Sequence, residues 1–258
     1  MIQKQFGLME VRLKELWGNN MISVCMATYN GEKYIRDQLI SILKQIGKND
    51  EVIVSDDGSV DGTLNVIKSL NDSRIKIYVN TGQHGFTHNF ENSLKYAQGD
   101  YIFLSDQDDI WRDNKVKTVL EYLEKYDLVI HDCKTVDNEM NVLQDSRFES
   151  FNIKGGFFRH LIKSRYLGCC MAFNRKVLRA IMPFPKNDKL VEHDIWIAAV
   201  GLLYFKTALI KQPLILYRRH GKNVSDGGFE KGYSLPNKVY RRLYRIICLC
   251  KIRKRISK

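Results

Sequence analysis

Residues 22–63 read ISVCMATYNGEKYIRDQLISILKQIGKNDEVIVSDDGSVDGT, and this stretch decides the fold. Short apolar runs at 22–27 and 51–55 enclose a segment, 32–45, whose apolar residues recur at steps of three and four. A short apolar run is typical of a buried strand, and the three-and-four step is typical of a helix that packs on one face. Strand, helix and strand in this order predict two parallel strands joined by a crossover helix.

The same alternation continues along the chain. Further strands are predicted at 75–79, 101–105 and 128–131, and further helices at 61–70, 87–97 and 114–125. This repetition predicts an α/β fold with a mainly parallel sheet flanked by helices. Beyond residue 132 the pattern is less regular, and we expect a helix at 151–163, a strand at 167–173, a helix at 192–203 and strands at 205–210 and 213–218.

Length and composition are those of one soluble domain with appendages. The chain has 258 residues, of which 44% are hydrophobic and 27% charged, and this balance excludes a disordered chain or a collagen. No stretch approaches the roughly 18 apolar residues of a membrane-spanning helix. The N-terminus lacks an apolar signal core, and the six cysteines have no CxxC spacing. We therefore expect free thiols and a cytoplasmic location.

Three of the predicted strands end in unusually polar turns. The first runs into TYNG (28–31), the second into SDDGSVDG (55–62) and the fourth into SDQDD (105–109). Ligands of such sheets bind beyond the carboxyl ends of the strands. We therefore look for the functional site in these three turns.

Asp106 and Asp108 are the strongest pair in the turns. Alternate carboxylates after a strand can face one hard cation, and Mg²⁺ or Mn²⁺ with a phosphorylated substrate needs only one or two of them. The alternative is structural, with Asp106 and Asp109 capping a helix that begins near Asp113. Asp56 and Asp57 have two interpretations as well: a hydrogen bond to a nucleobase or ribose, or a turn followed by a helix cap.

Taken together, these motifs resemble the inverting glycosyltransferases of family 2, which have a GT-A-type nucleotide-sugar fold. The resemblance continues through LGCCMAFNR (167–175), EHDIW (192–196) and YRRHGKNVS (217–225), and it covers residues 21–225. Within the family, SDQDDIW and EHDIW are most similar to bacterial polysaccharide transferases of the rhamnosyltransferase type.

The resemblance implies a role for each matching residue. It places the nucleoside of a UDP- or dTDP-linked donor at Thr28, Asn30, Asp56 and Asp57, and the donor diphosphate near Asp106. It implies that Asp106 and Asp108 hold Mg²⁺ or Mn²⁺, with His220 nearby, and that Gly168 lies beside the substrates. It makes Asp194 the catalytic base. The family often has Glu-Asp where this chain has His193-Asp194, so the departure affects the neighbour of the base.

These roles agree with elementary chemistry. A sugar hydroxyl is a weak nucleophile, and a positioned carboxylate that takes its proton accelerates attack by about 10²–10⁴. Asp194 is predicted at the start of a helix, where backbone donors favour an ionised carboxylate. One base without an enzyme nucleophile implies a single displacement with inversion. We expect the acceptor saccharide at 168–171 and after Lys186, with Trp111 and Trp196 either stacking on sugars or packing beneath the loops.

The excess positive charge lies at the C-terminus. Nine Lys and Arg residues and no acidic residue occur in 238–258, so without them the net charge of +12 falls to +3. On a helical wheel one stripe is apolar and the opposite side is basic, as expected of a helix that lies on an anionic membrane beside a lipid-linked acceptor. The apolar stripe consists of Val239, Leu243, Ile246, Ile247 and Cys250, and the basic side of Arg241, Arg242 and Arg245. The alternative is that the stripe packs on the catalytic domain.

The sequence thus predicts three parts: an N-terminal extension (1–20), a GT-A-type domain (21–225) and a basic amphipathic tail (226–258). Two other functions compete with sugar transfer. A sugar-nucleotide nucleotidyltransferase shares the sheet and metal, but it has a Gly-rich basic phosphate loop that TYNG does not supply. A nucleic-acid-binding protein would use the basic tail, where Tyr240 and Tyr244 interleave with arginines, but no nucleic-acid motif accompanies them.

Overall fold

The computed structural model describes residues 20–220 and 233–256. The predicted N-terminal extension, except residue 20, and the boundary between domain and tail lie outside these residues. The strands are β1 (Ile22–Thr28), β2 (Glu51–Asp56), β3 (Ile75–Val79), β4 (Tyr101–Ser105), β5 (Ile110–Trp111), β6 (Leu128–Val136), β7 (Val142–Gln144), β8 (Met171–Asn174) and β9 (Thr207–Arg218). The helices are α2 (Ile35–Leu43), α3 (Thr63–Ser69), α4 (Phe86–Lys95), α5 (Lys115–Leu123), α6 (Arg147–Ser150), α7 (Phe157–Ile162), the 3₁₀ helix η1 (Gly168–Cys170), α8 (Arg175–Ile181), α9 (His193–Tyr204) and α10 (Leu235–Ile256).

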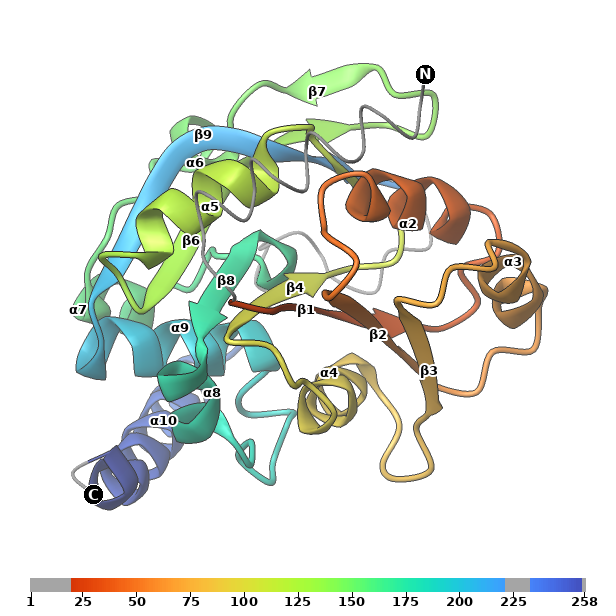
Figure 1. Cartoon of the computed structure of the whole chain (residues 1–258). Coiled ribbons are helices and arrows are strands. Elements are labelled where there is room, and N and C mark those ends of the chain that lie inside the picture. The colour runs from red at the N-terminus through yellow and green to blue at the C-terminus, as the bar shows by residue number, and fades with distance from the viewer. Residues whose placement is uncertain (1–19, 221–232, 257–258) are drawn as a thin grey trace.

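All the strands belong to one curved sheet, in the order β3-β2-β1-β4-β8-β6-β9-β5, with β7 paired to β6 (Figure 1). The first four are parallel to one another, as predicted from the alternating pattern. The chain moves from β1 to β2 and β3 on one side and then returns to place β4 on the other side of β1. Ligands of open α/β sheets bind at such a reversal, beyond the carboxyl ends of the two strands.

The second half of the sheet mixes directions. Strand β8 runs antiparallel to both β4 and β6, whereas β6 and β9 are parallel. The two strands predicted at 205–210 and 213–218 form one continuous strand, β9, whose register against β6 shifts at Asp132. The shift places Pro213, which has no N–H to donate, opposite that irregularity, so the strand continues through the proline.

Two other predictions for this half need correction. The helix expected at 151–163 is shortened to α7 (Phe157–Ile162), because Gly155-Gly156 interrupts the segment and Gly156 takes a positive φ of 118°. The strand expected at 167–173 begins instead with η1, and only residues from Met171 onward pair with the sheet. Glycine allows backbone conformations that other residues avoid, so the apolar content of these two segments was not enough to predict their conformation.

Helices cover both faces of the sheet. Apolar side chains of α2, α3 and α5 pack on one face, and those of α4, α8, α9 and α10 pack on the other (Figure 1). Helix α9 is apolar nearly all round, and its residues from Trp196 to Gly201 are buried. This burial fixes the N-terminal end of α9, which carries His193 and Asp194, close to the rest of the core.

Helix α10 packs on α8 and α9, but with a different face from the apolar stripe. Its buried side chains are Arg245, Leu249 and Ile252, and the Tyr204 hydroxyl donates to the Leu249 carbonyl over 2.9 Å. The stripe is left exposed: its side chains are 46% (Val239), 53% (Leu243), 38% (Ile246) and 52% (Ile247) accessible, and Cys250 is exposed. The alternative that the stripe packs on the domain is therefore wrong.

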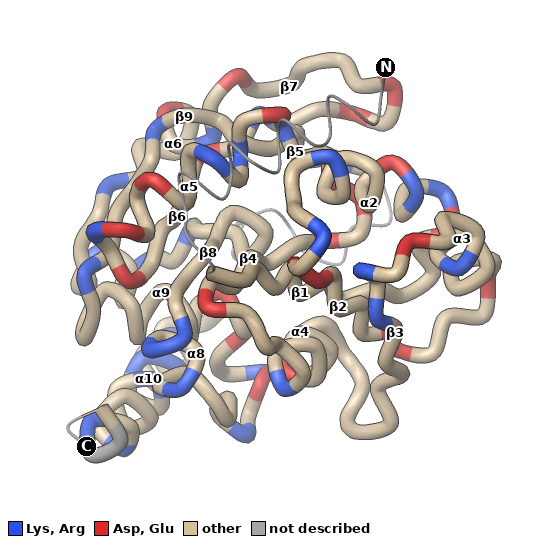
Figure 2. Tube along the Cα trace, in the orientation of Figure 1, with Lys and Arg blue, Asp and Glu red and all other residues tan. Residues whose placement is uncertain are grey.

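The basic side of α10 faces the protein. Arg241 donates to the Lys189 carbonyl, Arg242 to the carbonyls of Leu161 and Ile162, and Arg245 to that of His160. Lys and Arg recur along this helix without an acidic residue among them (Figure 2). Among the described residues, no helix has both the length and the apolar character needed to cross a membrane.

Candidate active site

The turns after β1 and β4 are joined by Gln107, a residue to which the sequence analysis gave no role. The Thr28 hydroxyl donates to the Gln107 amide oxygen over 2.5 Å, and the Tyr29 N–H donates to the same oxygen over 2.9 Å. The Gln107 amide nitrogen donates in return to the Tyr29 carbonyl over 3.0 Å. A Cβ on Gly31 would lie 2.2 Å from that amide oxygen, so a side chain at this position would displace the Gln107 amide. The predicted strand-end turns therefore do come together.

Asn30 joins the turn after β1 to the turn after β2. Its backbone has a positive φ of 48°, a conformation that asparagine tolerates better than most residues. Its N–H donates to the Ser59 hydroxyl over 2.9 Å, and its side-chain oxygen accepts from the Val60 N–H over 2.9 Å. Asn30 thus fixes the relative position of the two turns that the resemblance assigns to the nucleoside.

Asp56 and Asp57 both make hydrogen bonds within the protein. The Asp56 carboxylate is buried and accepts from the N–H groups of Gly58 and Ser59, over 3.1 and 2.9 Å, and from the Ser59 hydroxyl. The turn that the sequence analysis set beside nucleoside binding is therefore present. Asp57 instead accepts from the Asn80 amide and the Gly85 N–H, both over 2.7 Å, which ties the segment between β3 and α4 to this edge.

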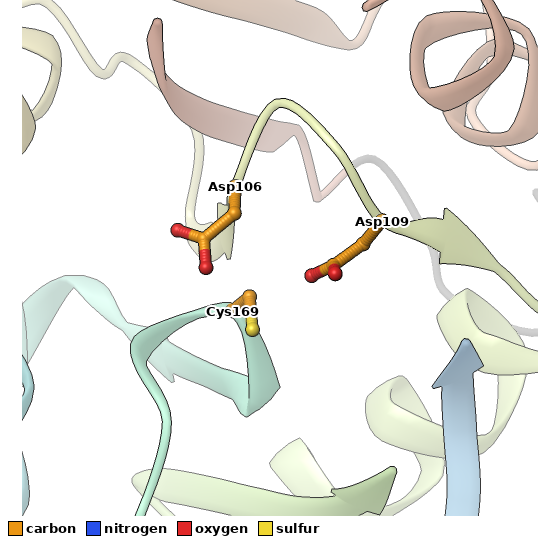
Figure 3. Close-up of side chains that lie close together, drawn as sticks. All are labelled: Asp106, Asp109 and Cys169. Atoms are coloured by element: carbon orange, nitrogen blue, oxygen red, sulfur yellow. The ribbon is translucent and has the colours of Figure 1, made fainter. Parts of the chain in front are cut away.

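The sequence predicts Asp106 and Asp108 as the metal-binding pair of the turn after β4, whereas the cluster found in the structure contains Asp106 and Asp109. Asp106 and Asp109 extend from the two ends of the β4–β5 turn toward the region occupied by Cys169 of η1 (Figure 3). One ligand atom from each of these residues lies within 4.8 Å of the others. Asp109 is buried and accepts from the Arg218 N–H over 3.2 Å, while its other oxygen has no hydrogen-bond partner among the described residues.

The capping interpretation of these aspartates is wrong. Helix α5 begins at Lys115, its cap residue is Asn114, and no side chain caps it. Asp109 contacts Arg218 of β9 instead. The acidic turn is therefore not explained by the helix that follows it.

The carboxylates of the turn disfavour one another's ionisation. Burial, followed by the charge of Asp108, raises the pKa of Asp106 to about 7. Burial, followed by the charges of Asp108 and Asp106, raises the pKa of Asp109 well above its usual range. A divalent cation relieves this kind of repulsion. The oxygen donors and the unpartnered Asp109 oxygen thus fit a hard cation such as Mg²⁺ or Mn²⁺.

The Cys169 thiol does not suit such a cation. A hydrogen bond with Cys170, followed by burial, raises the pKa of Cys169 well above its usual range, so the sulfur stays protonated. Neutral sulfur is a poor ligand for Mg²⁺ or Mn²⁺. We therefore assign the ligand capacity of this cluster to its carboxylates.

His220 and Asp108 are brought together, as the resemblance implied. The His220 Nε2 lies 2.8 Å from an Asp108 carboxylate oxygen, although 112 positions separate the two residues. The imidazole stacks on the Tyr34 ring with centroids 4.8 Å apart, and the Arg218 guanidinium lies 4.9 Å from the same ring. Arg218 also donates from Nε to the Asp108 carbonyl over 3.0 Å. Neither Tyr34 nor Arg218 was singled out by the sequence analysis.

Lys115 is a buried cation beside the acidic turn that the sequence analysis also missed. Its ammonium donates to the Cys169 carbonyl over 3.0 Å and lies 3.9 Å from the Trp111 ring centroid. Burial lowers the pKa of Lys115 to about 8, against the raising effect of Asp106 and Asp109 among other neighbours. Trp111 is buried beneath the turn, and Trp196 is buried with its N–H donated to the Ile181 carbonyl, so both tryptophans pack inside the protein.

Asp194 lies in the first turn of α9, half-buried, and accepts from the Ile195 N–H over 2.6 Å. Burial, then the charge of Glu192, raises its pKa to about 7, and the charge of Asp106 adds a smaller effect. The direction is opposite to that expected from the helix terminus alone, because burial outweighs the backbone donors. A pKa near 7 suits a general base.

Gly168 and His193 contact each other closely. A Cβ on Gly168 would lie 2.4 Å from the His193 Nε2, so only glycine fits at the start of η1. The His193 ring is buried and stacks on Phe90 with centroids 4.3 Å apart. Burial lowers the pKa of His193 to about 3, so the imidazole stays neutral beside Asp194.

Comparison with known proteins agrees with this arrangement. The family model described as glycosyl transferase family 2 matches residues 23–182. The chain is 35% identical to the Escherichia coli UDP-Glc:α-D-GlcNAc-diphosphoundecaprenol β-1,3-glucosyltransferase WfaP, over 89% of this chain and 91% of that protein. It is 27% identical to the Shigella flexneri dTDP-rhamnosyl transferase RfbG, over 85% of this chain and 81% of that protein.

A solved structure supports the fold. The Staphylococcus aureus TarS fragment 1–349, crystallised with UDP-GlcNAc, superposes with a TM-score of 0.65 at 20% identity, over 86% of this chain. The chain spans 64% of that fragment and less than two thirds of several other curated relatives. The match over 23–182, the long alignment with WfaP and the fold lead to one assignment. The chain belongs to glycosyltransferase family 2, with a GT-A-type fold, and is a glycosyltransferase.

Proposed function

We propose that this protein transfers a sugar from a UDP- or dTDP-linked donor to a hydroxyl of a lipid-linked saccharide, with inversion and with a divalent cation. The observation that carries the proposal is the meeting of two parts of the chain. The Cys169 sulfur of η1 lies within 4.8 Å of ligand atoms of Asp106 and Asp109, and the neighbouring Gly168 is packed against His193, the residue before Asp194. A diphosphate site and a base must meet in this way for the reaction to occur.

The donor would occupy the edge formed by the turns after β1, β2 and β4. Thr28, Asn30, Asp56 and Asp57 would surround the nucleoside, and their hydrogen bonds to neighbouring turns support a preformed site. Preformed sites lose less conformational freedom on binding. Asp56 and Asp57 both remain candidates for accepting the N–H that uracil and thymine share.

Asp106 and Asp108 would hold Mg²⁺ or Mn²⁺, with Asp109 as a further carboxylate and His220 positioned by its contact with Asp108. When bound, the cation neutralises negative charge on the nucleoside diphosphate. The protein's own contribution is to orient the ligands: Arg218 fixes the backbone of Asp108 and donates its N–H to Asp109.

Asp194 would take the proton of the acceptor hydroxyl as it attacks the anomeric carbon. Its pKa near 7 leaves the carboxylate basic enough to accept the proton and sufficiently ionised at neutral pH. Burial lowers the pKa of His193 to about 3, so its imidazole is too weak a base to replace Asp194. Gly168, in contact with His193, would border the acceptor saccharide.

The substrate classes are suggested by the relatives. WfaP is named for a UDP-glucose donor and an acceptor linked by a diphosphate to undecaprenol, and RfbG for a dTDP-linked donor. A donor of either nucleotide type and a lipid-linked acceptor are therefore our proposal for this chain, in the synthesis of a cell-surface polysaccharide.

Two other functions are less well supported. Family membership favours transfer over a nucleotidyltransferase reaction. The nucleic-acid interpretation loses three of its basic residues, because Arg241, Arg242 and Arg245 are hydrogen-bonded to carbonyls of the domain.

The test is a panel of UDP- and dTDP-linked sugars incubated with the protein, Mg²⁺ or Mn²⁺ and a diphospholipid-linked saccharide. We expect release of nucleoside diphosphate and a longer saccharide from one donor class. Release of pyrophosphate instead would contradict the proposal, and so would a panel without any donor turnover.

We further propose that α10 holds the enzyme on the cytoplasmic face of an anionic membrane. Its exposed apolar stripe supports this, because four large side chains in water are costly unless they contact an apolar partner. The opposite basic side faces the domain, so attraction would come from other cations of the helix, such as exposed Lys251 and Arg253. Each adds about 1 kcal/mol at most.

Flotation with vesicles tests this proposal. The wild type should float with anionic vesicles and less so at high salt, whereas the double variant Leu243→Asp, Ile247→Asp should remain unbound. Because both side chains are exposed, the variant should melt at the wild-type temperature. The matched control is Lys117→Asp, at an exposed position of α5, which should float like the wild type. Equal flotation of the double variant would overturn the proposal.

A further inference from the structure

A second binding region lies beside α7. A pocket of about 380 Å³ is lined by basic and aromatic side chains, among them Lys154, Arg159, His160, Lys163, Arg165 and Tyr166. Four of these side chains are always or usually cationic, and none is acidic. None belongs to the metal, nucleoside or base positions described above.

The cations of this pocket are not neutralised within the described part of the chain. Lys154, Arg159 and Lys163 are exposed and take part in no ion pair there. Arg165 donates to the Phe151 carbonyl and lies 5.4 Å from the Phe151 ring, contacts that orient the guanidinium without cancelling its charge. Four like charges around one concavity repel each other, and an anionic ligand relieves that repulsion.

One wall of the pocket is connected to the proposed base. His160 lines the pocket, and its Nε2 lies 2.9 Å from the carbonyl of Ile195, the residue after Asp194. Tyr166, which stacks on His160 with centroids 5.4 Å apart, is two positions before Gly168. The pocket therefore adjoins both segments that we assign to the acceptor saccharide.

The other wall is connected to α10. Arg242 donates to the carbonyls of Leu161 and Ile162 over 3.3 and 2.7 Å, so α10 lies against the end of α7. The α7 side chains of Phe158 and Ile162 are 76% and 63% exposed, which extends the exposed apolar surface from α10 toward the pocket.

We propose that this basic pocket binds the diphosphate of the lipid-linked acceptor. The order of groups in such an acceptor is saccharide, diphosphate and lipid. The protein presents Asp194, the basic pocket and the apolar stripe of α10 in the same order. Arginine forks and lysine ammonium groups bind phosphate oxygens by charge-assisted hydrogen bonds. The inference rests on the proposed function for the saccharide end and adds the recognition of the diphosphate.

The experiment compares two acceptors that carry the same saccharide. In one the saccharide is joined to a long alkyl chain through a diphosphate, and in the other it is joined directly to the alkyl chain. Transfer is measured in neutral detergent for the wild type, for Arg159→Gln with Lys163→Gln, and for the control Lys117→Gln with Lys125→Gln, two exposed lysines on or after α5. Hydrolysis of the donor without acceptor is measured for all three.

We expect the pocket variant to raise the KM for the diphosphate acceptor about tenfold or more, since each lost charge-assisted bond costs about a factor of ten. The KM for the neutral acceptor and the rate of donor hydrolysis should stay within twofold of the wild-type values. The melting temperature should be unchanged. Equal KM changes for both acceptors, or no change, would overturn the proposal. The assay is repeated with anionic vesicles in place of detergent. A rise in KM that appears only with these vesicles and is equal for both acceptors would also overturn the proposal, because it would assign the pocket to a lipid headgroup.

Failure of the pocket proposal differs from failure of the proposed function. If the wild type neither hydrolyses donor nor transfers sugar, the proposed function is wrong. If the wild type transfers sugar and the pocket variant behaves like it with both acceptors, only the pocket proposal is wrong.

Discussion

The parallel half of the molecule and the mixed half use their polar side chains differently. In the parallel half, β1 to β4 and their turns, side chains such as Gln107, Asn30 and Asp57 hydrogen-bond across neighbouring turns. The mixed half consists of β6 to β9 with α7 to α10. Its pocket is surrounded by Lys154, Arg159 and Lys163, which make no ion pairs within the described residues. This difference agrees with our proposal that the first half holds the nucleotide-sugar donor and the second receives the charged acceptor.

The central claim is that the parallel half holds the donor and the mixed half activates the acceptor. The two halves meet where the acidic turn after β4 approaches the start of α9. A substitution in one half should therefore leave the function of the other half intact.

The largest effect is expected for Asp194→Asn. The amide cannot accept the hydroxyl proton, so transfer should fall by about 10²–10⁴. Because the residue belongs to the mixed half, donor affinity measured by calorimetry should stay within about twofold. The control Asp37→Asn changes an exposed carboxylate on α2 and should transfer normally. Transfer near the wild-type rate in Asp194→Asn would reassign the base, with Glu192 as the next candidate.

The next effect concerns the acidic turn. Removal of divalent cations with EDTA, or the substitution Asp108→Asn, should lower both transfer and donor hydrolysis by about 10² or more, since a bound cation supplies several kcal/mol. Added Mn²⁺ or Mg²⁺ should restore the EDTA-treated wild type. Asp113→Asn, an exposed position just after the same turn, is the matched control. Unchanged turnover in EDTA would remove the cation from the account.

A smaller effect is expected from pH. Burial, Glu192 and Asp106 raise the pKa of Asp194 to about 7, and Arg245 opposes them. Below that pH the base is protonated, so kcat/KM for transfer should fall about tenfold per pH unit and level off above it. Glu192→Gln removes one raising charge and should move the midpoint to lower pH. A midpoint that stays in place in this variant would contradict the assignment.

The smallest effect on activity, but a measurable one on stability, is expected for Gly168→Ala. The new methyl group would meet the His193 Nε2 at 2.4 Å, and overpacking of this kind costs about 1–3 kcal/mol of unfolding free energy. Gly47→Ala is the control, because its nearest neighbour would lie at an ordinary 3.5 Å. Denaturant unfolding measures both. Equal stability of the two variants would show that η1 yields without cost.

The sequence was sufficient to predict the parallel half. Strands that alternate with helices have to place their carboxyl ends at one edge, so Thr28, Asn30 and the acidic turn were expected together and are found together. Asp194 and His220 came from the family resemblance, since nothing in the local pattern brings residue 220 to Asp108. The structure now places that contact at 2.8 Å.

Other features depend on tertiary contacts that no local pattern encodes. Gln107 and Lys115 read as ordinary polar surface residues, yet one joins two turns and the other is buried against Cys169. The direction of the Asp194 pKa was missed because burial is a property of the fold. Helix α10 has two apolar arcs, and the one with Leu249 and Ile252 packs inward, together with Arg245, which donates to the His160 carbonyl.

The most direct test of the central claim is the anomeric configuration of the product, read from proton NMR couplings after transfer from a donor of known configuration. A single displacement, with the donor held by one half and the hydroxyl activated by Asp194 of the other, predicts inversion: a β-linked product from an α-linked donor. Retention of configuration would require a second displacement and a nucleophile, and it would contradict this account of the site.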